Sequence, residues 1–214
     1  MNNANLQKRL NPKQRVNKVL KGDLPDRVPW VDSFVPWAGE DYYSGAELPE
    51  KILKRPREIH YKYIRNYPEV LDYLGMDALI FRVTAPVYCE IITENGMEMF
   101  GHGRIASRED LKNVHYPDPG AADMLKEAEK LSREYGDTYT LIFSTRSGFM
   151  NTYLNLGYDG FSYALIDDPG FIDDLFYKTR DWYLAVAENL KQFDFDCIRI
   201  TDDVAGKDGL LFSP

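Results

Sequence analysis

The hydrophobic and polar positions of this chain change period several times, and the changes predict alternating strands and helices. Short apolar or β-branched runs indicate four strands, at residues 27–32, 78–83, 139–144 and 197–201. Apolar residues at helical spacing predict the helices that connect them, at 56–74 with an interruption at Pro68, at 121–135, at 147–155, at 161–166 and at 170–193. Because strands joined by crossover helices pair in parallel, the pattern predicts a parallel α/β sheet.

Local signals mark where several of these elements begin and end. Asn11 followed by Pro12 predicts the start of a short leading helix, and Gly22 predicts its end. The Asn-Gly pair at 95–96 separates two strand-like runs, 89–93 and 97–101. Asn-Gly in this setting is a strong hairpin signal, so we expect a β-hairpin inserted after the second strand.

Four β/α units make half of a (β/α)8 barrel, and this is the fold that we expect. A complete barrel needs roughly 250 residues, and this chain of 214 also contains a leading helix and a hairpin. We therefore expect a single domain over 1–214 that carries the amino-terminal half of the barrel and is incomplete at its carboxyl end. Either the barrel is truncated, or another copy or another chain completes it. An open doubly wound sheet would require a glycine-rich turn after the first strand, which residues 31–34 do not provide.

Composition narrows the class of protein. The chain is 44% hydrophobic and 28% charged, as in ordinary globular domains. A net charge of -8 argues against a nucleic-acid surface and against an anionic membrane partner. No apolar run approaches about 18 residues, and the polar start has no signal-peptide core, so we expect a cytoplasmic protein. Cys89 and Cys197 lie far apart, and we interpret them as buried thiols.

The most informative polar residues are the adjacent carboxylates Asp202 and Asp203. They follow the strand at 197–201 and precede a loop that contains Gly206. Parallel α/β enzymes place their catalytic residues at this end of the strands, so we expect at least one of the two carboxylates to act in catalysis. The alternative is that they cap a helix.

Further candidates lie near the ends of the other strands. Arg82 would either bind an anion or form an ion pair with one of the two carboxylates, and both interpretations stay open. Arg146 would contact an anionic substrate group or be a solvated loop arginine. Trp37 and Tyr42, in a long loop at 33–49, would stack on a ligand or cover the mouth of the barrel.

Several segments together resemble the uroporphyrinogen decarboxylase superfamily: residues 15–22, 25–29, 75–78 and 202–206, with Ser213 and Pro214. That superfamily also contains zinc-dependent methyltransferases, which move methyl groups to or from corrinoid proteins and thiols. The resemblance implies a (β/α)8 barrel with a deep cleft at the carboxyl ends of its strands. It also implies a salt bridge in the turn at Asp26 and Arg27.

Departures from the decarboxylase pattern favour the methyltransferase branch. The loop at 31–42 contains no arginine, whereas decarboxylases carry a Met-Arg-Gln-Ala-Gly-Arg-Tyr motif there to hold carboxylates. Arg82 falls where a decarboxylase aspartate is expected, and Asp203 replaces the serine of an Asp-Ser-Trp-Ala-Gly motif. Tyr153 matches a decarboxylase site tyrosine, and we include it among the substrate-binding candidates.

The resemblance therefore implies methyl transfer between a small donor and a corrinoid protein or a thiol, with Asp202 and Asp203 orienting the reacting groups. The family's zinc ligands, a His-x-Cys and a later Cys, come from the second half of the barrel. The histidines and cysteines of this chain lack ligand spacing, so we assign no metal to its residues and expect zinc only if the second half supplies the ligands. The alternatives are a decarboxylase (carboxy-lyase) acting on an anionic tetrapyrrole, and a non-catalytic half-barrel that works by association, for example as a homodimer.

Overall fold

The structure is a computed structural model, and it describes residues 9–32, 54, 62–64, 68–94, 97–207 and 209–212. The chain divides into two compact units, which we describe separately. The first unit comprises Met1–Arg82, Ala122–Ser144 and Lys191–Arg199. The second comprises Val83–Ala121, Thr145–Leu190 and Ile200–Pro214. The chain thus passes from the first unit to the second at the end of a strand on each of three occasions.

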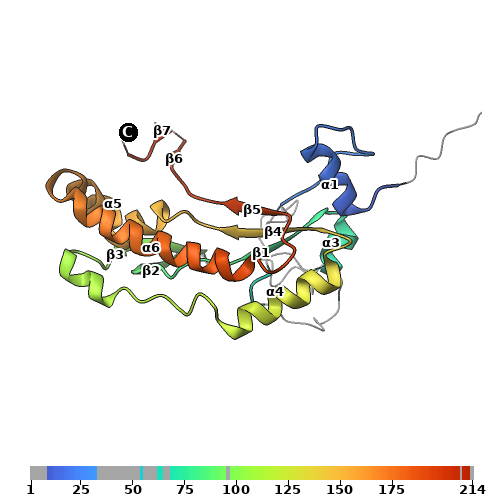
Figure 1. Ribbon diagram of the computed structural model, residues 1–214. Coiled ribbons are helices and arrows are strands. Elements are labelled where there is room, and N and C mark those ends of the chain that lie inside the picture. Colours follow the sequence, from blue (N-terminus) through green and yellow to red (C-terminus); the bar gives the residue numbers. More distant parts are fainter. Residues whose placement is uncertain are drawn as a thin grey trace, which may run out of the picture. The chain divides into compact units, whose positions relative to one another are not determined.

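The first unit is built on a three-stranded sheet with the strand order β1-β4-β5 (Figure 1). Its strands are β1 (Ala78–Arg82), β4 (Thr140–Thr145) and β5 (Cys197–Ile200). β1 and β4 are parallel, in a register that pairs Ala78 with Thr140. β5 is parallel as well, because Asp196 N donates to Leu141 O at 2.8 Å and Thr201 N donates to Thr145 O at 2.8 Å. Three of the four predicted strands and their parallel pairing are confirmed, and the fold is a mixed α/β fold.

The strands differ in how far their two faces are buried. All six residues of β4 and the first four of β1 are buried, as expected for parallel strands covered on both sides. β5 alternates instead, and its side chains Ile198 and Ile200 are 60% and 61% exposed. One face of β5 therefore leaves apolar surface open.

Three helices of the first unit begin and end close to the predicted residues, but the helix predicted at 56–74 is wrong at the described residues 62–64, where Ile64 forms an isolated antiparallel bridge with Phe81. α1 (Pro12–Leu20) is capped by Asn11, whose side chain accepts from Gln14 N at 2.8 Å. α3 (Pro68–Leu74) ends before Gly75, which adopts a left-handed φ of 74°. α4 (Ala122–Tyr135) buries Met124, Ala128 and Leu131, the apolar stripe of an amphipathic helix.

The strand predicted at 27–32 is wrong, because residues 28–32 pair with no strand of the described chain. Pro29 has no N–H to donate to a ladder. The neighbouring Trp30 N donates at 2.8 Å to the Asp77 side chain, while Trp30 O accepts from Asp77 N at 2.8 Å. The Asp77 side chain and a backbone hydrogen bond to Asp77 therefore hold Trp30 in place.

A buried ion network links α1, the segment after it and the start of β1. Asp77 is 0% exposed and accepts from Arg15 Nη1 at 2.5 Å and from Arg27 Nη1 at 2.8 Å. Arg15 also donates to Asp26, from Nε at 2.6 Å and from Nη2 at 2.9 Å. The salt bridge implied for Asp26 and Arg27 is therefore divided between two other pairs, Asp26 with Arg15 and Arg27 with Asp77.

The second unit packs a β-hairpin and two long helices together. The predicted hairpin is confirmed, and its antiparallel strands are β2 (Cys89–Glu94) and β3 (Met97–Gly103). The hairpin and α6 both pack against α5. The remaining elements are α5 (Phe149–Asp167), α6 (Pro169–Leu190), the 3-10 helix η1 (Arg108–Asn113), and the two-residue strands β6 (Ala205–Gly206) and β7 (Gly209–Leu210).

A kink at Gly157 divides α5. This residue has φ 76° and ψ 163°, which no helix contains, so the two shorter helices predicted here are joined across a break. Gly103 of β3 lies against the kink, since a Cβ at Gly103 would come within 2.4 Å of the backbone at residues 155–157. Glycine at both positions allows the hairpin to approach the helix backbone directly.

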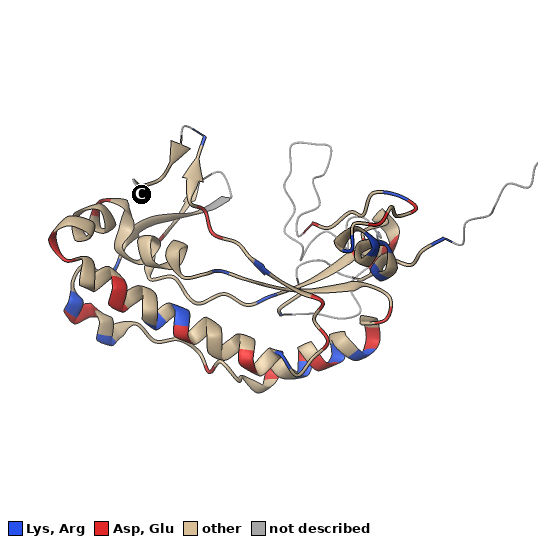
Figure 2. Ribbon diagram, turned by 45° about the horizontal axis from the view of Figure 1, so that its top comes forward, with Lys and Arg blue, Asp and Glu red and all other residues tan. Residues whose placement is uncertain are grey.

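Charged side chains of both signs alternate along the long helices (Figure 2). Exposed ion pairs such as Lys62–Asp123 in the first unit and Arg108–Asp168 in the second belong to this solvated surface. None of the helices in the described part of the chain is long and apolar enough to cross a membrane.

The ion network predicts a large effect of the Asp77→Asn substitution. The substitution leaves the buried Arg15 with Asp26 as its remaining acidic partner and removes the carboxylate that pairs with Arg27. Breaking a buried ion pair typically lowers the free energy of unfolding by about 3–5 kcal/mol. Urea unfolding of the wild type and the variant measures this change. Glu134→Gln, which breaks an exposed pair with Arg133 on α4, is the control and should change stability little. Equal effects of the two substitutions would show that the network does not stabilise the fold.

The same network predicts a dependence on acid. The hydrogen bond from Arg15 to Asp26 is the main reason why the pKa of Asp26 lies well below its ordinary value of 3.8, although desolvation raises this pKa somewhat. A lowered folded-state pKa stabilises the protein above the unfolded-state pKa, and this stabilisation is lost as the pH falls through the folded-state value.

We therefore expect the wild type to be more stable than Asp26→Asn above about pH 5, with the difference narrowing as the pH is lowered towards 2. Unfolding at a series of pH values measures it. Asp23→Asn, which changes an exposed carboxylate three residues away, is the matched control for the loss of one surface charge. A constant difference for Asp26→Asn would contradict the expectation.

Candidate functional site

The predicted carboxylate pair follows β5 in the second unit, and its two members have different surroundings. Asp202 is partly buried and accepts from Ser147 N at 3.2 Å, from the Ser147 hydroxyl, and from Met150 N at 3.4 Å. These groups belong to the start of α5. Asp202 therefore satisfies donors at a helix N-terminus and places a negative charge at the positive end of the helix. The capping alternative describes Asp202, although the helix that it caps lies 55 residues earlier in the chain.

Asp203 is exposed, and its side chain makes no hydrogen bond or ion pair with any described residue. It lines a cavity of about 420 Å³ together with Phe100 of β3 and with Met150, Tyr153 and Tyr158 of α5. A free carboxylate beside aromatic side chains can accept a hydrogen bond from a ligand. Of the two aspartates, Asp203 is thus the one available for chemistry.

Tyr153 supplies the second polar group of this cavity. Its side chain is 1% exposed, and burial raises its pKa far above the ordinary value, with Tyr158, Asp203 and Asp202 raising it further. The phenol is therefore protonated at neutral pH and can donate a hydrogen bond. Its ring stacks on Tyr158 with the centroids 5.4 Å apart.

An aromatic cluster holds Tyr153 in place. Phe149 and Phe161 of α5 and Phe212 near the end of the chain surround it, and the Phe161 and Phe212 rings approach to 4.5 Å. Tyr153 and Phe161 are almost fully buried in the core of the second unit. The cluster therefore connects the cavity wall to the hydrophobic core.

Arg146 lies directly after β4 and is 9% exposed, so it is not a solvated loop arginine. Its guanidinium carbon lies 6.0 Å from the centre of the Phe100 ring, which also lines the Asp203 cavity. Its Nε is buried without a hydrogen-bond partner. Sequence analysis selected this residue, but its burial could not be predicted.

The other candidates lie elsewhere. Arg82 ends β1 in the first unit, where it pairs in register with Ser144, and its backbone N–H donates to Tyr63 O at 2.7 Å. Its role stays a prediction. Trp37 and Tyr42 lie outside the described residues. The structure thus brings together Asp202, Asp203, Tyr153 and Arg146 within the second unit.

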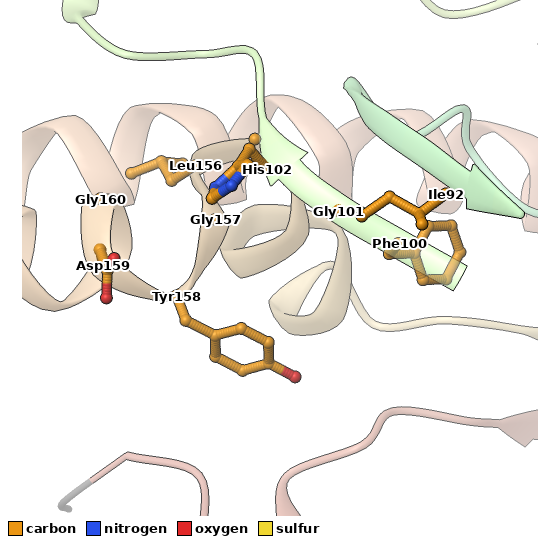
Figure 3. Close-up of a pocket in the computed structure, with 10 residues that line it drawn as sticks. Ile92, Phe100, Gly101, His102, Leu156, Gly157, Tyr158, Asp159 and Gly160 are labelled. Carbon is orange, nitrogen blue, oxygen red and sulfur yellow. The ribbon is translucent and has the colours of Figure 1, made fainter. Parts of the chain in front are cut away.

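A second cavity of about 400 Å³ lies where β3 meets the kink of α5 (Figure 3). His102 and Phe100 line it from β3, and Tyr158 and Asp159 line it from α5. Phe100 and Tyr158 are shared with the Asp203 cavity. The sequence carried a signal for this arrangement in the glycines at 157 and 160, which separate the two predicted helical segments.

A buried polar network, which sequence analysis missed, supports the site. The Tyr183 hydroxyl accepts from Ala85 N at 3.0 Å and donates to Asn151 Oδ1 at 2.9 Å, and burial raises the pKa of Tyr183 to about 12. Asn151 Nδ2 in turn donates to Ala85 O at 3.2 Å. Asn151 and Asn155, one turn apart on the buried face of an apolar helix, were the available signal.

The described residues do not fit a zinc site. Among the described residues, no group of three His, Cys, Asp or Glu side chains lies close enough together to hold a metal ion. Burial raises the pKa of both thiols, Cys89 and Cys197, which keeps them protonated and poor metal ligands at neutral pH.

Comparison with known proteins relates the fold to one solved structure. No protein-family model and no curated protein matches the sequence. The structure is similar to a methyltransferase from Methanosarcina mazei, with a TM-score of 0.55 and 15% sequence identity. The match covers 94% of this chain but 61% of the methyltransferase chain. At this identity the similarity concerns the fold.

The division between the two aspartates predicts different effects of their removal. Asp202→Ala leaves the start of α5 without its acceptor and should lower the free energy of unfolding by about 1–2 kcal/mol. Asp203→Ala breaks no described contact and should leave stability within about 0.5 kcal/mol of the wild type. Paired urea titrations measure both values. The reverse order would show that Asp203, not Asp202, holds the helix.

Proposed function

We propose that this chain is part of a (β/α)8-barrel enzyme of the uroporphyrinogen decarboxylase superfamily, acting as a methyltransferase between a small donor and a corrinoid protein or a thiol. The observation that carries the proposal is Asp203, a carboxylate three residues after β5 that lines an aromatic cavity and makes no hydrogen bond with a described residue. The similarity of fold to a methyltransferase supports the same class of reaction. A cytoplasmic location belongs to the proposal.

The residues of the cavity suggest separate roles. Asp203 would orient the substrate by accepting a hydrogen bond, and Tyr153 would donate one from a fixed position. Asp202 would position α5 and the residues that it carries, since its own oxygens are occupied. Arg82, Arg146, Trp37 and Tyr42 would contribute to substrate binding.

Zinc and the corrinoid would have to be held outside the described residues of this chain. In such enzymes zinc supplies a Lewis acid or lowers the pKa of a bound thiol. Because no described group of ligands fits the metal, we assign no step of the reaction to it. The corrinoid would arrive bound to a partner protein.

A tetrapyrrole decarboxylase is the second candidate function. The position of Tyr153 at the cavity favours it, because this tyrosine matches the decarboxylase pattern. The absence of arginine from residues 31–42 weighs against it, since a substrate with several carboxylates needs cations to bind it. Arg82 in place of an aspartate weighs against it as well.

Association without catalysis is the third candidate. Ile198 and Ile200 leave apolar surface open on β5, which lies at the edge of the described sheet. Exposed apolar residues on an edge strand favour pairing with another chain or with a further part of the same protein. Such a partner, or a second copy, would cover this face.

Methyl transfer by the full natural chain tests the proposal. N-, O- and S-methyl compounds serve as donors, with a thiol or a corrinoid protein as acceptor and the methylated product as readout. Asp203→Asn should lower kcat by about 100-fold, the cost of misplacing a substrate, while stability is unchanged. Asp173→Asn, an exposed change on α6, is the control and should retain the full rate. Full activity of Asp203→Asn would refute the role of this residue, and coproporphyrinogen formation from the tetrapyrrole would favour the decarboxylase.

A further inference from the structure

Arg146 is a largely buried cation that forms no ion pair with a described residue. It is 9% exposed, and its Nε is buried without a hydrogen-bond partner among the described residues. Its guanidinium carbon lies over the ring of Phe100, 6.0 Å from the ring centre. Proteins rarely bury a charge in this way unless something else neutralises it.

The preceding residue in the chain carries a second unpartnered donor. Thr145 is 5% exposed, and its Oγ1 has no hydrogen-bond partner among the described residues. Neighbouring acceptors are already in use. The Asp202 carboxylate binds the start of α5, and the Tyr183 hydroxyl is shared between Ala85 and Asn151. Arg146 Nε and Thr145 Oγ1 therefore lack hydrogen-bond partners among the described residues.

Phe100 connects Arg146 to a space for a ligand. Its ring contacts the Arg146 guanidinium and also lines the cavity of about 420 Å³ that contains Tyr153, Tyr158 and Asp203. The volume suits a small molecule, and the wall combines aromatic rings with few polar groups. A ligand that fills this cavity would have an apolar body beside Phe100.

We infer that Arg146 binds the carboxylate of a small ligand whose apolar body occupies the Asp203 cavity. A planar carboxylate matches the donors on the Nε edge of a guanidinium, which can bind it with two parallel hydrogen bonds. The ligand also supplies the negative charge that the folded protein lacks at this position. Binding of this kind anchors the substrate by a group that takes no part in the reaction.

This inference rests on the proposed function where it calls the ligand the substrate, but its test measures binding alone. Benzoate, which joins a carboxylate to an aromatic ring, is the probe, and benzyl alcohol is the uncharged comparison. Calorimetry or NMR titration of the full natural chain at low ionic strength gives the dissociation constants. We expect benzoate to bind and benzyl alcohol to bind at least about tenfold more weakly, since charge-assisted hydrogen bonds are lost.

Substitution of the arginine separates binding from folding. Arg146→Met should weaken benzoate binding by at least about tenfold, and Arg146→Lys, which keeps the charge but not the planar fork, should weaken it as well. Because the wild-type charge is buried without a partner, Arg146→Met should unfold at the same temperature as the wild type or a higher one. Arg180→Met, which alters an exposed arginine paired with Asp181, is the matched control for binding.

Unchanged benzoate affinity in Arg146→Met would overturn the inference. So would a fall in its unfolding temperature below that of Arg180→Met, because Arg146 would then be paired within the folded protein. Tight binding of inorganic phosphate without binding of benzoate would overturn the assignment of a carboxylate. A wild-type protein that transfers methyl groups but does not bind benzoate would refute this inference and leave the proposed function standing, whereas a wild-type protein that binds benzoate without methyl transfer would do the reverse.

Discussion

The neutralisation of Asp77 is the interaction on which the first unit depends. This carboxylate is fully buried one residue before β1, and a buried charge of this kind is tolerated only with close partners. Arg15 from α1 and Arg27 from the following segment supply the charge, and the backbone of Trp30 supplies a further donor. Asp77 O also accepts from Thr140 N at 3.2 Å, at the start of β4. Asp77 thus connects α1, the segment after α1 and the start of β4 at the amino ends of the strands. The candidate site residues lie after the carboxyl ends of the strands instead.

In the second unit, a carboxylate likewise holds a segment in place, at the start of α5. Asp202 and Asp203 are adjacent, yet Asp202 is committed to Ser147 and Met150 while Asp203 faces a cavity. A helix that begins at a strand end needs an acceptor for its first N–H groups, and a carboxylate from the neighbouring strand end provides it. Holding α5 in this way also fixes Tyr153, which projects from the same helix into the cavity wall. The structural aspartate therefore positions the groups among which the free aspartate lies.

Local patterns predicted the elements, and contacts between distant residues decided the rest. β1, β4, β5, the hairpin, α4 and α6 follow from hydrophobic periodicity and from capping or turn residues within a few positions. The strand expected at 27–32 failed because Trp30 N is bound by the side chain of Asp77, 47 residues later. The commitment of Asp202 to Ser147 could not be predicted for the same reason. The burial of Arg146 depends on how Phe100 and the helices enclose it, which no pattern in the sequence records.

Buried charged residues in the two units differ in whether they have hydrogen-bond partners within the protein. In the described part of the first unit the two charged residues that are buried, Arg15 and Asp77, have partners within hydrogen-bond distance. In the second unit Arg146 is 9% exposed, and its Nε has no hydrogen-bond partner among the described residues. A chain that neutralises charge so completely where the fold requires it would gain nothing in stability from an unpaired guanidinium. Departures from otherwise consistent physical rules concentrate at functional sites, so the unpaired charge is explained better by what binds there than by what holds the fold together.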